Sequence, residues 1–357
     1  MESWDKRLSH KLRLWLTALA MALSCGLAPI ASAQDQDFTA WLKALAEEAR
    51  AAGISDQIIE QALSGIEPIS RVVELDRRQP EFTITFRDYI TQRLSDTRIR
   101  RGLEQWTAHH ADIAQVAQAY GVDASVILAI WGLETNYGSY VGGFDVIPAL
   151  ATLAYDDRRG AYFRSELLAA LQILNRGDIA VPAMKGSWAG AMGQSQFMPS
   201  SFLAYAQDFD KDGRRDIWST PVDVFASIAH YLKRHGWRDD MIWGRPVALP
   251  DDFGARRQIV FDGETPEGCR RAMQHHSREM PVAEWDAFGI RRTNGDSLPP
   301  RDIAASLVVT DEGAGPAYLT YQNYRAILRY NCSNHYALSV GLLADRLKRE
   351  RARQNQP

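Results

Sequence analysis

The sequence predicts a mainly α-helical protein of the α+β type, with a small β-containing subdomain before its last helices. Apolar residues recur at helical spacing through residues 34–243 and again through 321–350. Between these regions, residues 244–320 carry short β-type runs separated by Gly, Pro and Asp. We therefore divide the chain at these positions and expect a flexible tail at 351–357.

Composition bounds the class of protein without identifying a ligand. The 357 residues are 46% hydrophobic and 24% charged, as in soluble globular proteins, and they suffice for two cores or one large core. The net charge of -3 argues against nucleic acid as the main ligand. The 10 Trp and 13 Tyr residues suit carbohydrate faces, although their usual role is to fill a core.

The N-terminus has the organisation of a secretory signal peptide. Four basic residues precede an apolar run at 14–27, and an A-x-A cleavage signal ends at Ala33. The run is shorter than the roughly 20 residues of a membrane-spanning helix. We expect residues 1–33 to be removed and the mature protein to be exported to the periplasm in soluble form. The alternative is an outer-membrane lipoprotein with lipid on Cys25, but the position three residues before it is Ala22 rather than the usual Leu.

Helical periodicity marks the helices in order. The expected helices cover 37–50, 55–63, 86–94, 113–120, 123–136, 150–157, 162–175, 321–329 and 336–349. Ser55 caps the second helix, and Gly121 stops the fourth, which forms a tight αα-hairpin with the next. Pro80 interrupts the pattern before the helix that begins near Phe86. Pro199 opens a further helix after an irregular segment rich in Gly, Ala and Met at 185–199.

Four short runs predict the strands of the β-containing subdomain. They are RPVALP at 245–250, RQIVF at 257–261, SLVVT at 306–310 and AYLTY at 317–321. Each run is bounded by turn-forming residues, which is typical of short strands in a mixed subdomain.

One carboxylate stands within an apolar helix. The segment DASVILAIWGLETN at 123–136 has Asp123 as its N-cap and Gly138 just past its end. Glu134 lies four residues after Ile130 and therefore on the same apolar face. A buried carboxylate is costly unless it is paired or keeps its proton. Glu134 is therefore either a partnered structural residue at a helix end or a functional acid.

An acidic loop has the spacing of an EF-hand. Carboxylates occupy positions 1, 3, 5 and 9, and Gly213 occupies position 6, where the loop must turn. Position 12 is Ser219 instead of a bidentate Glu. Hard oxygen ligands at this spacing predict a structural Ca²⁺ ion, and a solvated acidic loop is the alternative. The expected ligands are Asp208, Asp210, Asp212, the backbone carbonyl of Arg214, Asp216 and, as the replacement for position 12, Asp223.

Other kinds of reactive site are not indicated. The sequence has no HExxH, CxxC, GxSxG or P-loop motif, so we expect no organic cofactor and can place no serine or cysteine nucleophile. If Cys25 leaves with the signal peptide, Cys269 and Cys332 remain in an exported chain. The sequence leaves open whether these two cysteines pair.

Several motifs together resemble the lytic murein transglycosylase B family, which is related to lysozyme. They are RRQPEF at 77–82, GLETNYG at 132–138, ALATL at 149–153, AMGQSQFMPS at 191–200, the acidic loop, and YNCS at 330–333. They follow the family's order and cover nearly all of the mature chain, so the resemblance is specific. It implies a lysozyme-like helical catalytic core, with the C-terminal helices completing the cleft.

The resemblance implies a peptidoglycan lytic transglycosylase. Such enzymes cleave the β-1,4 bond between N-acetylmuramic acid and N-acetylglucosamine and form a 1,6-anhydro product without using water. The family's single catalytic Glu matches Glu134, and its calcium loop matches the acidic loop. Its cleft residues match Arg158, Arg159, Ser187, Gln196, Tyr231, Tyr330, Asn331 and Tyr336. The chain departs from the family in an extra residue before Pro221, which affects the last calcium ligand. It departs again at Gln194-Ser195, where some members carry an aromatic residue and a glycine.

A single carboxylate suffices for this reaction if the substrate supplies the nucleophile. Asp145, Asp156 and Asp157 are the acids nearest to Glu134 in sequence, and spacing places none of them on its face. Glu134 would protonate the leaving oxygen and then accept the proton of the muramic C6 hydroxyl as that oxygen closes onto C1.

Two alternatives to this function stay open. One is a hydrolytic muramidase of the lysozyme type, and the other is a non-catalytic, calcium-dependent cell-wall binding or scaffold protein. The expected partners are peptidoglycan glycan strands and proteins of cell-wall synthesis or division, and the chain is expected to be a monomer.

Overall fold

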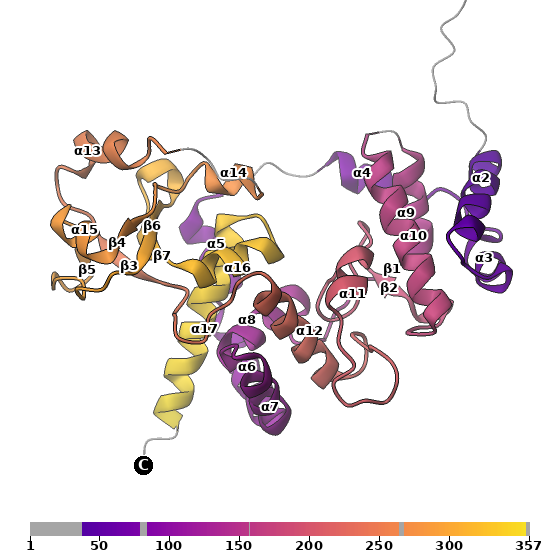
Figure 1. Ribbon diagram of the computed structural model, residues 1–357, viewed down its shortest axis with the longest axis horizontal. Helices are drawn as coiled ribbons and strands as arrows, with labels where there is room; N and C mark the ends of the chain where they lie inside the picture. The colour runs from indigo at the N-terminus through magenta and orange to yellow at the C-terminus, as the bar shows by residue number, and fades with distance from the viewer. Residues whose placement is uncertain (1–37, 79–83, 157, 264–267, 355–357) are drawn as a thin grey trace, which may run out of the picture. The chain divides into compact units, whose positions relative to one another are not determined.

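The structure is a computed structural model (Figure 1) and describes residues 38–78, 84–156, 158–263 and 268–354. The predicted signal peptide, Cys25, Pro80 and Asp157 lie outside the described residues. The chain divides into two compact units, 1–44 and 45–357. The described part of the first unit is the start of helix α2 (Phe38–Ala51), where the rings of Phe38 and Trp41 stack 5.7 Å apart.

Helices form most of the second unit up to residue 234. After α2 they are α3 (Asp56–Leu63), α4 (Ser70–Arg77), α5 (Phe86–Arg93), α6 (Asp96–Ala108), α7 (His110–Tyr120), α8 (Ala124–Thr135), α9 (Val146–Tyr155), α10 (Gly160–Arg176), α11 (Pro199–Tyr205) and α12 (Pro221–Arg234). Ser55, Thr85 and Ser95 each accept a hydrogen bond from the backbone N–H three residues on, as N-caps do. The helix expected at 86–94 is α5, with Leu94 as its C-cap, and Ser95 caps the next helix.

Helices α7 and α8 form the predicted hairpin. Gly121 ends α7 with a φ of 65°, and Asp123 caps α8 by accepting the N–H of Ser125. Helix α8 is buried from Ser125 through Leu133 because α7, α12 and α17 pack against it. Its end comes at Asn136, two residues before the glycine expected to stop it, and Asn136 adopts the left-handed conformation.

The segment 185–199 is irregular, as expected, and begins with the short strand β2 (Lys185–Gly186), which pairs with β1 (Phe144–Asp145). A 3₁₀ turn (Val181–Ala183) precedes it. Isolated bridges join Met192 to Gly186 and to Phe197, so this stretch folds back on itself before Pro199 opens α11. The segment therefore supplies backbone groups and short side chains next to the end of α8.

The β-containing subdomain is a five-stranded antiparallel sheet with the strand order β4-β6-β7-β3-β5. Its elements are β3 (Gly244–Ala248), α13 (Phe253–Val260), α14 (Arg270–Met273), β4 (Met280–Pro281), α15 (Val282–Ala287), β5 (Arg291–Arg292), β6 (Ala304–Val309), a 3₁₀ turn (Asp311–Gly313) and β7 (Ala317–Thr320). Figure 1 shows α13 and α15 beside these strands. Trp285 is fully buried in the core of the subdomain and donates to the carbonyl of Ala305 at 2.9 Å.

Two expectations for the C-terminal part of the chain were wrong. The run RQIVF at 257–261 falls mostly in helix α13 instead of a strand, since a short apolar run fits either structure until its neighbours decide. The last helices are α16 (Gln322–Tyr330) and α17 (Asn334–Gln354). Helix α17 packs on α8 and continues to Gln354, whereas a flexible tail was expected from 351.

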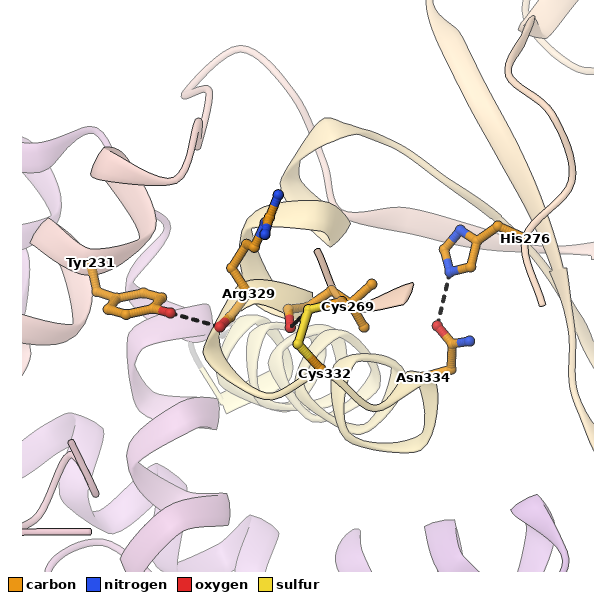
Figure 2. Close-up of a disulfide and its surroundings, with 7 residues drawn as sticks. Tyr231, Cys269, His276, Arg329, Cys332 and Asn334 are labelled. Atoms are coloured by element: carbon orange, nitrogen blue, oxygen red, sulfur yellow. Dashed lines mark hydrogen bonds between the residues drawn. A yellow bond between two sulfur atoms is a disulfide. The ribbon is translucent and has the colours of Figure 1, made fainter. Parts of the chain in front are cut away.

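Cys269 and Cys332 form a disulfide, which answers the question that the sequence left open (Figure 2). The bond joins the start of α14 to the loop between α16 and α17, across 63 residues of sequence. Beside it, His276 is hydrogen-bonded to Asn334 at 2.9 Å. The disulfide therefore fixes the short loop that links Tyr330 to Tyr336.

Among the described residues, no single helix has both the length and the apolar composition to cross a membrane. The pair α7 and α8 passes that test of length and composition together, with a bend of 114° between the two helices.

Reduction of the disulfide should destabilise the protein. Opening a 63-residue loop returns conformational entropy to the unfolded chain, which corresponds to about 4 kcal/mol. Urea unfolding with and without a phosphine reductant measures this change, and a Cys269→Ser/Cys332→Ser variant should match the reduced protein. Identical unfolding midpoints in both conditions would contradict the expectation.

Candidate active site

Glu134 lies in the last turn of α8 and is the one residue between Ser125 and Thr135 that is not fully buried. The rest of this stretch is apolar or small, and Trp131, one turn earlier, is 2% exposed. A helix that is buried on all sides thus presents a single carboxyl group at its end. The sequence placed Glu134 on the apolar face of this helix; in the structure the whole helix is buried and Glu134 is partly exposed at its end.

Burial raises the pKa of Glu134 from an ordinary 4.5 to about 7. Two groups oppose this effect by stabilising the carboxylate. The hydroxyl of Tyr336 donates to Oε1 of Glu134 at 2.6 Å, and the positive charge of Arg93 on α5 also lowers the pKa. Glu134 is therefore a group that can both release and accept a proton near neutral pH.

Three of the predicted cleft tyrosines form one cluster beside Glu134. The rings of Tyr330 and Tyr336 stack with centroids 6.5 Å apart, and Tyr231 meets Tyr330 edge-on at 4.9 Å. The hydroxyl of Tyr330 donates to the carbonyl of Ser195 at 2.6 Å. The hydroxyl of Tyr231 donates to the carbonyl of Arg329 at 2.6 Å (Figure 2). Tyr231 thus lies behind Tyr330 and supports it.

Gln196 and Ser187 lie in the irregular segment and hold its backbone. Gln196 has a φ of 51°, and its side-chain amide donates to the carbonyls of Val141 and Gly193 at 3.0 and 2.9 Å. The hydroxyl of Ser187 accepts the N–H groups of residues 189 and 191 at 3.3 and 3.0 Å, as in a turn. Both side chains therefore use their hydrogen bonds to stabilise the backbone of nearby loops.

Asn331 is exposed and lines a cavity of about 650 Å³. The cavity lies between the loop that follows α16 and the end of β6, and Arg271 also lines it. Asn331 directly follows Tyr330 in the chain, but neither Glu134 nor any of the three tyrosines lines this cavity.

The two predicted cleft arginines converge on a residue that the sequence did not single out. Arg158 binds Asp76 through Nε at 2.8 Å, and Arg159 forms an ion pair with the other oxygen of the same carboxylate. Asp76 is 5% exposed at the end of α4, so two cations balance one buried anion. Asp76 directly precedes the RRQPEF motif, and this position was the one feature of the sequence that could have drawn attention to it.

No second carboxylate is brought to Glu134 by the described residues. Asp145 pairs with Lys185, and Asp156 pairs with Arg77 at 3.1 Å. Asp157 lies outside the described residues. Among the groups that the structure describes, the formal charge that acts on Glu134 is the cation of Arg93.

The acidic loop gathers three of the predicted metal ligands. Oxygens of Asp208, Asp210 and Asp212 lie within 4.8 Å of one another. Gly213 has a φ of 93° and donates its N–H to Oδ2 of Asp208 at 3.0 Å. Oδ1 of Asp208 is buried and has no hydrogen-bond partner among the described residues. A group of three neighbouring carboxylates, one of which has an orphaned oxygen, fits a hard divalent cation such as Ca²⁺.

The remaining predicted ligands are not part of this three-carboxylate group. Asp216 accepts the N–H groups of Trp218 and Ser219, each at 2.8 Å. Asp223 is fully buried and accepts the N–H groups of Phe209 and Asp216 at 2.7 and 3.0 Å. These two carboxylates tie the two arms of the loop together. The carbonyl of Arg214 stays a predicted ligand.

Sequence reasoning missed two further residues around Glu134. Arg93 is the last residue of α5, and the periodicity of that helix did not indicate that its charge would act on Glu134. Gln194 was noted as a departure from the family motif, and it accepts a hydrogen bond from the indole N–H of Trp131 at 2.8 Å. In both cases the partner lies far away in sequence, so local pattern carried no signal.

Comparison with known proteins gives three concordant findings. Residues 37–345 match the family model of the transglycosylase SLT domain. The chain is 30% identical over 308 residues to the membrane-bound lytic murein transglycosylase B of Escherichia coli (strain K12), covering 81% of this chain and 77% of that protein. The fold matches SltB3 from Pseudomonas aeruginosa in complex with NAG-NAM-pentapeptide, with a TM-score of 0.81, 43% identity, and coverage of 88% and 80% of the two chains.

A further structural match is the Escherichia coli lytic transglycosylase Slt35 in complex with calcium. Its TM-score is 0.71 at 28% identity, with 87% of this chain and 93% of that chain covered. Together these matches confirm the predicted fold class, a mainly helical protein with a lysozyme-like core and a small sheet.

Replacement of Glu134 by Gln should stabilise the protein in a pH-dependent way. The raised pKa means that Glu134 contributes its full stability below pH 4.5 and loses it as pH rises to about 7. Gln avoids this loss and can still accept from Tyr336. The advantage of the variant in free energy of unfolding should therefore grow between these pH values and reach on the order of 3 kcal/mol above them.

Urea unfolding at pH 5 and pH 8 checks this expectation. The matched variant Glu60→Gln removes an exposed carboxylate on α3 and controls for the lost charge. An equal difference between wild type and Glu134→Gln at the two pH values would show that Glu134 ionises as easily in the folded protein as in the unfolded chain.

Proposed function

The chain belongs to the transglycosylase SLT domain family and is a lytic murein transglycosylase; from this premise we propose that it cleaves the β-1,4 bond between N-acetylmuramic acid and N-acetylglucosamine in peptidoglycan strands. We propose further that the reaction forms a 1,6-anhydro end and that Glu134 is its sole catalytic carboxylate. The observation that carries this proposal is a carboxyl group whose pKa is raised to about 7 and to which the described residues bring no second carboxylate.

The first step uses Glu134 as an acid. With a pKa of about 7, a substantial fraction of the group is protonated at neutral pH. It donates its proton to the glycosidic oxygen as the bond from that oxygen to C1 of the muramic sugar breaks. The leaving N-acetylglucosamine residue departs with a neutral hydroxyl, so it need not leave as an alkoxide.

The second step uses the same group as a base. The ionised Glu134 accepts the proton of the C6 hydroxyl of the muramic sugar while the C6 oxygen forms a bond to C1. This closes the anhydro ring and returns Glu134 to its protonated form. An enzyme with two carboxylates would instead direct a water molecule or a carboxylate at C1. The surroundings of Glu134 favour the intramolecular route, because the described residues supply no second carboxylate there.

The tyrosine cluster and its loop are proposed to hold the sugar. Tyr336 stabilises the ionised form of Glu134 through its 2.6 Å hydrogen bond. Tyr330, which stacks on Tyr336, and the adjacent Asn331 are proposed to contact the muramic residue. Gln196 and Ser187 would act mainly by shaping the backbone of the irregular segment.

Arg158 and Arg159 are proposed to bind carboxylates or acetamide groups of the strand. Their side chains are 52% and 40% exposed although both hold Asp76, so each guanidinium keeps free donors. Tyr231 acts through Tyr330 and is a positioning residue by this argument.

We propose that Asp208, Asp210 and Asp212 hold a structural Ca²⁺ ion. When bound, the ion would supply two positive charges, which offset most of the negative charge of the three neighbouring carboxylates. Export to the periplasm, soluble after cleavage at Ala33, is proposed on the sequence alone, as are partners in cell-wall synthesis or division.

Digestion of purified peptidoglycan tests the proposed function. Mass spectrometry of the released muropeptides should show anhydro ends for the wild type. Glu134→Gln should lower their rate of formation by on the order of 10³-fold, since it removes both proton transfers. Reducing ends in place of anhydro ends would make the protein a hydrolytic muramidase, and strand binding without turnover would make it a cell-wall binding protein.

The pH dependence of kcat should move when Tyr336 is replaced by Phe. Activity requires protonated Glu134 in the first step and therefore falls as pH rises past about 7. The Tyr336 hydrogen bond lowers the pKa of Glu134, so its loss should shift the alkaline limb of the profile to higher pH.

The Tyr336→Phe profile is measured against that of Tyr162→Phe, an exposed tyrosine on α10. A shift of the alkaline limb to lower pH in Tyr336→Phe would contradict the assignment of that limb to Glu134.

A further inference from the structure

Gln194 joins the end of α8 to the exit of the acidic loop. It lies in the irregular segment after β2, and its side chain is 8% exposed. Its backbone N–H, backbone carbonyl, side-chain oxygen and side-chain amide each make a hydrogen bond to one of these two regions. A buried amide with every group satisfied in this way is a rigid bridge between the two regions it contacts.

On one side, Gln194 holds the residues that flank Glu134. Its side-chain oxygen accepts the indole N–H of Trp131 at 2.8 Å, and its backbone carbonyl accepts the hydroxyl of Thr135 at 3.1 Å. The hydroxyl of Thr135 also accepts the N–H of Gly138 at 3.1 Å. A Cβ atom on Gly138 would lie 2.3 Å from the side-chain oxygen of Gln194, so the chain after α8 closes tightly over this side chain.

On the other side, Gln194 holds the segment that leaves the acidic loop. Its backbone N–H donates to the carbonyl of Ile217, and its side-chain amide donates to the carbonyl of Trp218, both at 2.7 Å. The N–H of Trp218 donates in turn to Asp216, whose own N–H donates to Asp223. Asp223 also accepts the N–H of Phe209 at the entry of the loop, so the entry and the exit of the loop are joined.

We propose that Gln194 is a positioning residue that transmits cation binding in the acidic loop to the catalytic turn of α8. The inference rests on the proposed calcium site and on the proposed role of Glu134. Without a cation, the carboxylates of Asp208, Asp210 and Asp212 repel one another, which loosens the loop and its exit. A bound cation removes this repulsion and orders the exit of the loop. Because Gln194 is hydrogen-bonded to residues 217 and 218 of that exit, its side chain then becomes ordered too. Linkage then requires that an ordered end of α8 also favour cation binding.

Two substitutions of Gln194 test its hydrogen bonds to the acidic loop and to α8. Gln194→Glu keeps an acceptor for Trp131 but replaces the donor to the Trp218 carbonyl with a carboxylate oxygen, so it breaks the loop side. Gln194→Met has a similar volume and removes both side-chain hydrogen bonds. The control is Gln207→Met, because Gln207 makes comparable hydrogen bonds to Tyr120 and to the carbonyl of Ala206 at the loop entry.

Hydrogen exchange of the peptide 131–138, followed by mass spectrometry with calcium chloride or with a chelator, gives the direct readout. Calcium should slow this exchange about tenfold in the wild type and in Gln207→Met, in line with typical couplings between sites. In Gln194→Glu and Gln194→Met, calorimetry should still detect calcium binding, while exchange of 131–138 should no longer respond to it. Gln194→Met should also lower kcat about tenfold with KM unchanged, because the orientation of Glu134 is lost and the strand contacts remain.

Three results would overturn the inference. They are a wild type that does not bind calcium, exchange of 131–138 that ignores calcium in the wild type, and equal protection by calcium in the Gln194 variants. Failure of the proposed function would be visible separately, as an absence of anhydro products from the wild type. The exchange comparison does not depend on turnover and would still decide the role of Gln194.

Discussion

Desolvation of the partly exposed Glu134 carboxyl in the last turn of α8 is the constraint on which the other features of the site depend. Because ionisation is costly there, the pKa of Glu134 rises to about 7. The fold limits this cost with one hydrogen bond from Tyr336 and with the charge of Arg93, which come from two other helices. A pKa near neutrality is also what allows one carboxyl group to act as acid and then as base.

The C-terminal part of the chain positions the groups that contact the Glu134 carboxyl. Helix α17 packs along α8 and brings Tyr336 to Glu134 from 202 residues away. The disulfide fixes the loop that links Tyr330 to Tyr336, and its other cysteine belongs to the inserted β-containing subdomain. A second link joins that subdomain to α5, since Asp311 accepts the N–H of Phe86 at 2.7 Å. The subdomain therefore contacts both α17, which carries Tyr336, and α5, which carries Arg93. These are the two residues that stabilise the Glu134 carboxylate.

Local features of the fold could be predicted from the sequence, and contacts between distant segments could not. Asp123 and Gly121 act within one turn of their own position, so their capping roles were readable. The run at 257–261 was misjudged because a strand and a short helix fit it equally well. Arg158 was expected in the cleft, but its binding to Asp76 depends on how α4 meets the loop after α9, which no local pattern records. Helical periodicity singled out Glu134 and the motif resemblance gave it a role, whereas the size of its pKa shift follows from packing.

The most direct test of this account is a measurement of the Glu134 ionisation itself. Carbon-13 NMR of protein labelled at the glutamate side-chain carboxyl would follow each titration, and the resonance missing from Glu134→Gln would identify the group. This carboxyl should titrate near pH 7. Titration near the ordinary value of 4.5 would contradict it, because Glu134 would then be ionised at neutral pH and could not serve as the acid.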